Sequence, residues 1–548
     1  MAHYKVIVVG GGPVGLTAAC LLADLGVKTA IVEQAKGPVD LPRAISLVDE
    51  TFRTMSRIGI GERLLSETNL DTGSRYFGLN NRLLLAAKPG PSRTGFPGKS
   101  QFDQAVMEEE LYKAARLRSG VDLMNEVKAI AIKQDVSLVT LEVEGPQGPR
   151  VLTADWVIGA DGGRSFVRDT SGIQLIGTTQ GERWIVVDLL NERRRYEKAA
   201  EFHCDGQRPH VIVPGVGGRL RIEFMLFDHE DAVAMTAPGM IRKLVQPFRP
   251  DLRDKDIRRA SVYVAHRRVA ERFRDRRVIL IGDAAHLMPP FAGQGLNAGI
   301  RDAANIAWKL ADVVKGRGTE ALLDSYEKER RPNVVDMVKL SGRIGRVVMM
   351  RGLPARLRDL FIGVVTTVPS IRSWLAYMRF IKPAHCLDGV ASSPSSGIAE
   401  NLRLLVGRPL PQPHVSANGR RQRLDELLGL GWTLLCIGGQ EERPFSRLDP
   451  FWRRIDAAQL AIGTANQAGA EGEVQDLDGW LAEPPATQPT FLLVRPDRYI
   501  AAAFTASSEA RTISDIREYF KTGESQDPGI PRRDNLFSSQ AREEFSNA

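Results

Sequence analysis

A glycine-rich run near the N-terminus, together with one later carboxylate, has the residue types and spacing that bind an ADP group. The run at residues 10–15 (GGGPVG) follows an apolar stretch predicted as a strand and opens a stretch of helical periodicity. Its glycines allow a tight turn, a close approach of the backbone to a pyrophosphate, and close packing of helix on strand. A carboxylate 23 positions after the first glycine can accept both ribose hydroxyls. The residues predicted to contact an ADP-containing cofactor are Gly10, Gly12, Pro13, Val14, Gly15 and Glu33.

Two later segments also place acids and glycines directly after apolar stretches. Residues 155–168 (DWVIGADGGRSFVR) end a predicted strand at Asp161-Gly162 and start a helix with Ser165 in a capping position. Residues 278–302 (VILIGDAAHLMPPFAGQGLNAGIRD) contain Gly282-Asp283, a proline turn and a second glycine cluster before a long helical pattern. These segments are candidates for further contacts with the same cofactor.

The three segments, in this order and at this spacing, resemble the motifs of the single-component FAD-dependent aromatic hydroxylases over about residues 4–345. The resemblance implies that Asp283 holds the ribityl hydroxyls of FAD. It also implies that the glycine cluster lies beneath the pyrimidine ring, where the helix N-terminus stabilises the negative charge of reduced flavin. FAD is expected to be noncovalent, because no His or Cys lies in an attachment motif of the family. The other residues that the resemblance assigns to FAD are Arg43, Gln104, Val127, Asp161, Gly162, Gly282, Pro290, Gly293, Gly295, Leu296 and Asn297.

The activity implied by this resemblance is that of an NADH- or NADPH-dependent aromatic-ring monooxygenase. In that family reduced FAD reacts with O2 to a C4a-hydroperoxide, which transfers one oxygen to a phenol or catechol. Deprotonation activates such a ring, so the site needs a proton acceptor and a dry cavity. By strand order, His203 falls where the family has a phenol-facing tyrosine, and Pro290 falls where it has a carbonyl close to the ring. Both are therefore predicted as catalytic, since an imidazole can accept a proton near neutral pH.

The sequence leaves the identity of the aromatic substrate open. Pro214 and Val216 stand where the family clamps a benzoate carboxylate, so benzoates are disfavoured. Arg221, in the run RIEF, resembles the 3-(3-hydroxyphenyl)propionate hydroxylase branch, which also contains nitrocatechol monooxygenases. The two resulting candidates are nitro displacement of the 4-methyl-5-nitrocatechol type and hydroxylation of the 3-(3-hydroxyphenyl)propionate type. The alternatives of another class are a non-oxygenating FAD reductase and a flavin-binding regulatory protein.

These residues must be positioned by helices and strands, and the pattern of expected helices and strands predicts a chain of α/β and α+β class with a discontinuous first domain. We expect a Rossmann-like FAD-binding domain at 1–180 and 274–345, interrupted at 181–273 by an antiparallel-sheet substrate domain. A helix is expected to end before Arg331-Pro332, and 346–397 is predicted as a helical segment and linker. Residues 398–548 resemble the thioredoxin-like domain appended in this family. Strands are predicted at 184–187, 210–213, 220–226, 261–265, 432–437 and 490–494, and a last helix at 513–520.

The composition argues against several other classes of protein. The 548 residues are 43% hydrophobic and 26% charged, a globular balance whose apolar runs are too short to cross a membrane. The net charge of +8 comes from basic residues interleaved with acids, and aromatics are only 7%, which argues against nucleic acid. Four cysteines without CxxC and eight histidines without ligand spacing predict no metal site. We expect a cytoplasmic protein without a membrane partner, and a homodimer is left open.

Overall fold

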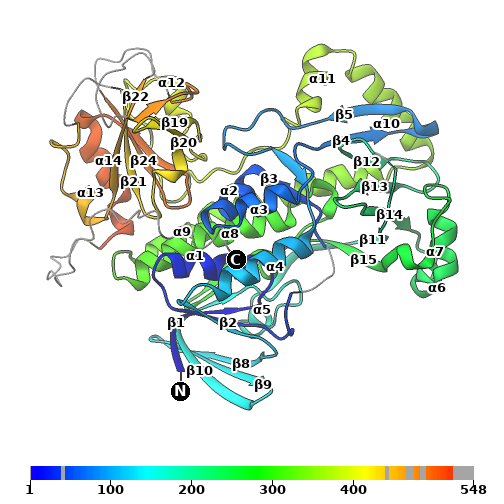
Figure 1. Ribbon diagram of the computed structural model, residues 1–548, viewed down its shortest axis with the longest axis horizontal. Coiled ribbons are helices and arrows are strands. Elements are labelled where there is room, and N and C mark those ends of the chain that lie inside the picture. Colours follow the sequence, from blue (N-terminus) through cyan, green and yellow to red (C-terminus); the bar gives the residue numbers. More distant parts are fainter. Residues whose placement is uncertain are drawn as a thin grey trace.

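The polypeptide is a mixed α/β structure built on three large β-sheets, which Figure 1 shows as separate groups of arrows. The computed structural model describes residues 2–38, 43–194, 196–438, 444–464, 474–481 and 489–521. The first sheet lies at the bottom of this view, the second at the right and the third at the upper left. Among the described residues, no helix is both long enough and apolar enough to cross a bilayer.

The first sheet is centred on a strand that is buried on both faces. Its strands are β1 (Ala2–Val9), β2 (Thr29–Val32), β7 (Val121–Met124), β8 (Lys128–Gln134), β9 (Val139–Gly145), β10 (Gly148–Gly159), β16 (Arg274–Asp275) and β17 (Val278–Leu280). The order is β16-β17-β10-β1-β2-β7, with β8 and β9 attached to β10. Val6, Ile7 and Val8 are fully buried, as is typical of a parallel strand covered on both sides. Because β1, β2, β10 and β17 run parallel, their C-terminal ends meet at one edge.

Helices cover this sheet, and two of them begin where local chemistry favours a helix. The helices around the sheet are α1 (Pro13–Asp24), α2 (Asp49–Arg57), α3 (Gly61–Ser66), α4 (Gln104–Arg116), α5 (Phe166–Thr170) and α8 (Gly295–Val314). Pro13 has the fixed φ angle that suits the first position of α1. Asp103 caps α4 by accepting the backbone N–H of Ala105. A short ribbon of β3 (Ser46–Val48) and β6 (Lys99–Gln101) lies beside α2 and α4.

The second sheet is antiparallel over most of its width, and the four strands predicted for it are confirmed. It has the order β18-β15-β11-β14-β13-β12-β4-β5. Its strands are β4 (Gly73–Phe77), β5 (Leu83–Ala87), β11 (Leu175–Leu189), β12 (Ala199–His203), β13 (His210–Pro214), β14 (Leu220–Leu226), β15 (Ile257–Ala270) and β18 (His286–Leu287). The sequence did not predict β4, β5 or β12. Since β4 pairs in parallel with β12, residues 73–87 complete a sheet whose other strands follow a hundred residues later.

The two faces of the second sheet have different neighbours, because side chains alternate along each strand. Ile222 and Phe224 of β14 pack with the helices α6 (Ala232–Thr236) and α7 (Pro238–Val245) on one face. Met225 lies on the other face, in a cluster that includes Phe291. This second face is the one directed at the first domain.

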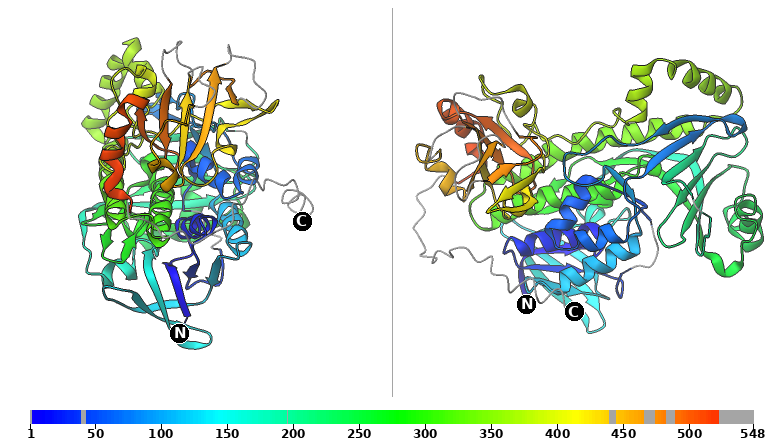
Figure 2. Two further views of the ribbon diagram at one scale, coloured as in Figure 1. Left: turned by 90° about the vertical axis from the view of Figure 1, so that its left-hand side faces the viewer. Right: turned by 45° about the horizontal axis from the view of Figure 1, so that its top comes forward.

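One helix of 29 residues, α9 (Glu320–Val348), connects the three parts of the molecule. It continues through Pro332, so the predicted helix end before Arg331-Pro332 is wrong. Proline leaves the carbonyl of Lys328 without its helical partner, and Lys328 is exposed, so water can take that place. Figure 2 shows α9 running from beneath the third sheet toward the second. It is followed by α10 (Gly352–Val365) and α11 (Pro369–Ala376) beside β5.

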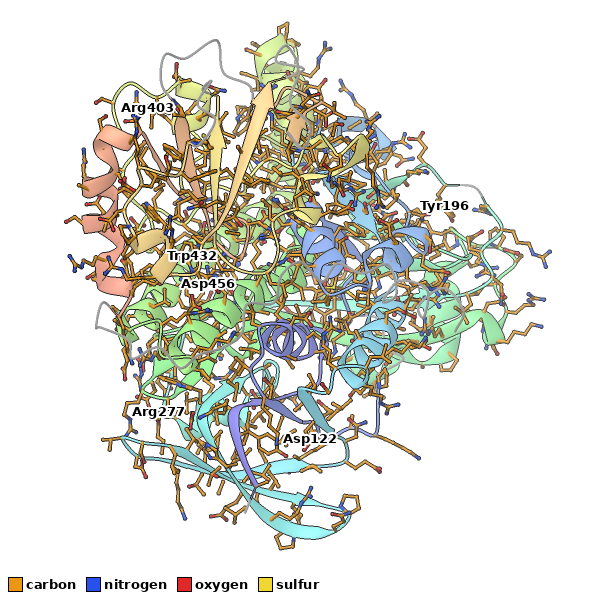
Figure 3. All side chains as sticks on the ribbon, turned by 60° about the vertical axis from the view of Figure 1, so that its left-hand side comes forward. Asp122, Tyr196, Arg277, Arg403, Trp432 and Asp456 are labelled. Atoms are coloured by element: carbon orange, nitrogen blue, oxygen red, sulfur yellow. The ribbon has the colours of Figure 1, made fainter. Side chains whose placement is uncertain are left out.

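The third sheet belongs to the C-terminal part of the chain and packs on helices of the first. Its order is β20-β19-β23-β22-β21-β24-β25, and both predicted strands are present. Trp432, which is labelled in Figure 3, meets Trp308 of α8 edge to face with ring centroids 5.1 Å apart, and its indole donates to Asp312. The thioredoxin-like and Rossmann-like assignments stay predictions. The elements here are α12 (Glu400–Arg403), β19 (His414–Ala417), β20 (Arg420–Arg423), β21 (Thr433–Ile437), α13 (Phe451–Arg454), β22 (Ala458–Thr464), β23 (Val474–Asp476), β24 (Thr490–Val494), β25 (Ile500–Phe504) and α14 (Glu509–Ile516).

Candidate functional site

Two adjoining cavities run from the C-terminal edge of the first sheet to the second sheet. The motif cavity, of about 400 Å³, is lined by the predicted residues Gly10, Gly12, Pro13, Glu33, Arg43, Gln104, Val127, Asp161 and Gly162. The sheet cavity, of about 340 Å³, is lined by Gly12, Pro13, Val14, Arg43, Gln104, Gly162, Asp283, Pro290, Gly293, Gly295 and Leu296. The shared residues make one elongated space, which suits a long dinucleotide with a ring system at its inner end.

The glycines of the first motif have distinct structural roles. Gly10 has a φ of +109°, and a Cβ there would lie 2.4 Å from the carbonyl oxygen of Ala160. Gly15 does not line either cavity, because its Cα faces the carbonyl of Gly10 at the start of α1. A Cβ on Gly12, in contrast, would meet no protein atom within 4 Å. Gly12 is therefore the position where the backbone opens onto the cavity.

Glu33 and Gln104 hold two stretches of backbone at the cavity wall. The carboxylate of Glu33 accepts the N–H groups of Gly11 and Ala35, each at 2.6 Å. The amide oxygen of Gln104 accepts the N–H of Arg43 at 2.9 Å and of the next residue at 2.6 Å. Both side chains line a cavity while fixing its wall, so each can position a ligand directly and through the backbone.

The loop after β10 is tied to the loop after β17. Asp161 accepts hydrogen bonds from the Ser165 hydroxyl and from the backbone of Val167, and Ser165 caps α5 as predicted. Burial raises the pKa of Asp161. The guanidinium of Arg168 donates to the carbonyls of Gly163 and Ala284. The two loops are thereby held as one wall of the cavity pair.

Asp283 lies in a short 3-10 turn, η3 (Gly282–Ala284), directly after β17. Its side chain opens into the sheet cavity and is exposed there, while desolvation by the surrounding protein atoms raises the pKa of its carboxyl. Gly282 itself does not line the cavity. It has a φ of +60°, and a Cβ there would lie 3.2 Å from Val14, so it lets the turn approach α1 closely.

The second glycine cluster is organised by a buried asparagine. Asn297 accepts hydrogen bonds from the N–H of Val48 and the hydroxyl of Thr51, and donates to the carbonyls of Ser46 and Gly293. It does not line the cavity, so its predicted contact with a cofactor is replaced by a role in shaping the loop. The N-terminus of α8, at Gly295 and Leu296, does open into the cavity.

The two residues predicted as catalytic lie in different places. Pro290 lines the sheet cavity in the turn η4 (Pro290–Ala292), where its carbonyl accepts the N–H of Gly293 at 2.8 Å. His203 lines neither cavity. Its ring stacks on those of Phe77 and His210, and it lies 3.3 Å from Glu201. Because neighbouring residues of a strand point to opposite faces, His203 points away while Phe202 lines the cavity. This geometry does not support His203 as the proton acceptor.

Three charged residues of the sheet cavity were missed as site residues in the sequence. Glu223 and Arg221 line the cavity from alternate positions of β14, and Lys99 lines it from β6. Lys99 donates to the hydroxyl of Ser74, and burial lowers its pKa to about 8. The i, i+2 spacing in RIEF could have shown that Arg221 and Glu223 share a face, but not that this face meets the cavity.

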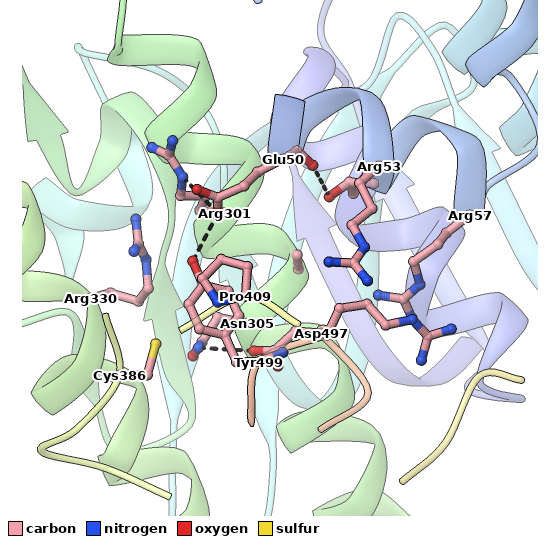
Figure 4. Close-up of a pocket in the computed structure, with 13 residues that line it drawn as sticks. Glu50, Arg53, Arg57, Arg301, Asn305, Arg330, Cys386, Pro409, Asp497 and Tyr499 are labelled. Carbon is pink, nitrogen blue, oxygen red and sulfur yellow. Dashed lines mark hydrogen bonds and ion pairs between the residues drawn. The ribbon is translucent and has the colours of Figure 1, made fainter. Parts of the chain in front are cut away.

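A third, small cavity of about 30 Å³ lies between α2, α8 and the third sheet (Figure 4). Glu50 accepts hydrogen bonds from Arg301 at 3.1 Å and from the hydroxyl of Tyr499 at 2.8 Å. Asn305 donates to Asp497. These contacts bind the C-terminal part to the helix whose N-terminus lines the sheet cavity. In the described ranges, no group of three or more His, Cys, Asp or Glu could hold a metal ion.

Comparison with known protein families identifies two matching regions. Residues 3–341 match the family described as FAD binding domain, and residues 407–519 match the HcaD C-terminal domain. The chain is 36% identical over 515 residues to the 3-(3-hydroxy-phenyl)propionate/3-hydroxycinnamic acid hydroxylase of Mycolicibacterium smegmatis. This match covers 91% of the chain and 90% of that relative.

Solved structures agree with this assignment. The flavin-dependent monooxygenase PieE, in complex with FAD and substrate, matches 94% of the chain and 99% of its own, with a TM-score of 0.79 and 22% identity. The p-nitrophenol 4-monooxygenase PnpA from Pseudomonas putida matches 69% of the chain and 98% of its own, with a TM-score of 0.63 and 25% identity. The chain belongs to the FAD-dependent aromatic-ring monooxygenases.

Proposed function

We propose that the protein uses NADH or NADPH and O2 to hydroxylate a phenolic ring that carries an anionic side chain. The observation that carries this proposal is the position of Lys99, which lines the apolar sheet cavity and has no carboxylate partner among the described residues. The relatives named for 3-(3-hydroxyphenyl)propionate, whose substrate has such a side chain, support it. The proposal therefore places a substrate of this type in the sheet cavity.

The cavity pair fits FAD by the chemistry of its walls. We assign the ADP end to the motif cavity, where Gly12 admits a pyrophosphate and Glu33 is placed for the ribose. We assign the ribityl chain to Asp283 and the pyrimidine end of the ring to the N-terminus of α8 at Gly295. Bound FAD would supply the redox chemistry, taking electrons from NAD(P)H and activating O2.

The protein's own part is to bind, orient and dehydrate the ring. Ala200, Phe202, Val211 and Val213 of the second sheet provide an apolar floor, and Phe291 of η4 packs in the same cluster and also lines the cavity. Such walls exclude water, which would otherwise break down the species that transfers oxygen to the ring. The carbonyl of Pro290 and the carboxyl of Glu223 are acceptors for a substrate hydroxyl in this space.

The direct test mixes the FAD-loaded protein with NADH or NADPH under air and a panel of ring compounds. The panel contains 3-(3-hydroxyphenyl)propionate, phenol and 4-methyl-5-nitrocatechol, and coenzyme loss, hydroxylated product and nitrite are recorded together. Coupled product formation, strongest with the propionate, is the expected result. Coenzyme oxidation without any hydroxylated product would favour a non-oxygenating reductase, and absence of stimulation would favour a regulatory flavoprotein.

Nitro displacement is the second candidate. The match to PnpA, named for p-nitrophenol, supports it at 25% identity over 69% of the chain. A nitro-bearing catechol needs no anionic side chain, so this candidate gives Lys99 no partner. Release of nitrite from 4-methyl-5-nitrocatechol in step with coenzyme oxidation would favour nitro displacement over hydroxylation of the propionate.

The oligomeric state is a separate question, and a homodimer stays a prediction.

Replacing Lys99 by methionine is expected to raise the KM for 3-(3-hydroxyphenyl)propionate by about 10- to 100-fold, because a hydrogen bond to a charged group contributes about 1.5–3 kcal/mol. The KM for neutral phenol should change less than about threefold on the same scale. Steady-state kinetics with both substrates measure the difference. Lys88→Met, at an exposed lysine paired with Asp71, is the matched control. Equal changes for both substrates would contradict the assignment of Lys99.

A further inference from the structure

The carboxyl group of Glu223 lies in the floor of the sheet cavity, at the centre of an apolar row. Strand pairing places Glu223 between Val211 of β13 and Val186 of β11, and Phe202 of β12 continues the row. Glu223 is only 8% exposed. Apart from Asp283 at the end of β17, it is the one carboxylate that lines this cavity within the described part of the chain. A charged group in such surroundings needs a partner.

One oxygen of this carboxyl accepts a hydrogen bond from the protein, and the other accepts none from the described residues. The hydroxyl of Tyr263 donates to Oε2 of Glu223 over 3.1 Å. The Nη1 atom of Arg221 lies 3.9 Å from Oε1, which is beyond hydrogen-bond distance. None of the described residues donates a hydrogen bond to Oε1. The side chain therefore offers a fixed acceptor to any hydroxyl group bound in the cavity.

Burial makes Glu223 a stronger base than an exposed carboxylate, although cations lie near it. Burial raises the pKa of Glu223, and Arg221 and the hydrogen bond from Tyr263 oppose this without reversing it. A base of raised pKa is better matched to the weakly acidic proton of a phenol. The charged or titratable groups that face it are Arg221 on β14, Asp188 on β11, and Tyr263 and Arg259 on β15, whereas β13 presents only Val211.

We propose that Glu223 is a catalytic residue that accepts the proton of the substrate's phenolic hydroxyl. The phenol O–H bond breaks, its electron pair stays on the phenolate oxygen, and a new O–H bond forms at Oε1 of Glu223. No oxidation or reduction accompanies this step. The phenolate has more electron density at its ortho and para carbons, which prepares the ring for oxygen transfer. The inference rests on the proposed function, because it assigns the base for that same reaction.

The experiment compares the FAD-loaded wild-type protein with Glu223→Gln in two ways. Without coenzyme, ultraviolet difference spectra of bound 3-(3-hydroxyphenyl)propionate against pH report whether the ligand is phenol or phenolate. The wild type is expected to ionise the ligand at a lower pH than Glu223→Gln does. In turnover, Glu223→Gln should form product at least about 100-fold more slowly. The difference in the rate of product formation between wild type and Glu223→Gln should become smaller at high pH. It should also become smaller with a fluorinated analogue whose hydroxyl is more acidic.

The controls separate a catalytic role from a structural one. Glu201→Gln makes the same chemical change on β12 of the same sheet, where the carboxylate pairs with Arg75 and His203 instead of facing the cavity. It should leave both readouts unchanged. Glu223→Asp keeps a carboxylate and should restore part of the ionisation, which tests the idea even if the Gln variant folds poorly.

Two outcomes would overturn the inference. The first is a Glu223→Gln protein with the wild-type ionisation of bound ligand and an unchanged pH-rate profile. The second is a turnover defect that is the same for every phenol whatever its acidity. Failure of the proposed function itself looks different, because the wild-type protein would then hydroxylate no phenol while still giving the binding spectra.

Discussion

Gly12→Val is expected to yield a folded protein that has lost FAD. The added side chain would meet no protein atom near its Cβ and would fill the space where the backbone opens onto the cavity. Backbone approach to a pyrophosphate at this position requires the absence of a side chain. We expect FAD affinity to fall by at least about 100-fold, equivalent to about 2.7 kcal/mol. Flavin absorbance of the purified protein and titration of the apoprotein with FAD measure this loss.

The matched control for this change is Gly15→Ala in the same motif. A Cβ on Gly15 would lie 2.0 Å from the carbonyl oxygen of Gly10, so α1 would have to move away from β1. That variant should lower the melting temperature of the apoprotein. Gly12→Val should leave the free energy of unfolding of the apoprotein within about 1 kcal/mol of wild type, because its main cost is that valine is a poorer helix N-cap than glycine. A Gly12→Val protein that still purifies with full flavin occupancy would contradict the assignment of the motif cavity.

Glu329→Ala is expected to destabilise the protein by about 3–5 kcal/mol, because it would leave two buried cations without their shared partner. Glu329 lies on α9 and is 1% exposed. It accepts from Lys309 at 2.8 Å and from both Nη atoms of Arg495 at 2.8 Å. Arg495 belongs to the C-terminal part, so we also expect faster proteolysis between the first and third sheets. Thermal unfolding by circular dichroism and limited proteolysis measure the two effects.

The pH dependence of the stability difference between wild type and Glu329→Ala gives a second test of the role of Glu329. Burial opposes ionisation of Glu329, but Arg495 and Lys309 outweigh it and hold the pKa of Glu329 well below the ordinary 4.5. A lowered pKa stabilises the folded state above pH 4.5, and this contribution is lost as the pH falls below that value. The difference in the free energy of unfolding between wild type and Glu329→Ala should therefore become smaller in acid. Glu320→Ala, which removes an exposed ion pair with Arg274, should change stability by at most about 1 kcal/mol.

Local spacing predicted much of the wall of the motif cavity. The glycine run, Glu33 and the two later loops each combine a strand end with a turn, and such short-range patterns are visible in sequence. Gln104 and Arg43 are 61 residues apart, and both line the cavity, whereas the contacts with FAD that the family resemblance implies for them stay predictions. What local pattern could not give was the role of Asn297, because its four hydrogen bonds reach residues some 250 positions away as well as its own loop.

The substrate side was harder to predict, because it depends on strand register. A shift of one residue along β12 exchanges Phe202 for His203 at the cavity, and nothing in the sequence fixes that choice. Glu223 was overlooked for the related reason that its strand was recognised but its facing direction was not. The strands β4 and β5 were missed because they join the second sheet only through pairing with β12, far along the chain.

The course of α9 has a consequence for the modularity of this enzyme. Near one end the helix presents Glu329 to the C-terminal part, and near the other Gly345 lies against the ring of Phe291 in the cavity wall. An excised fragment ending near residue 345 would uncover Trp308 and deprive Glu329 of its counter-ion Arg495. The last third of the polypeptide is thus no detachable accessory, and an engineer who wants a smaller catalyst must redesign that face of α8 and α9 as well.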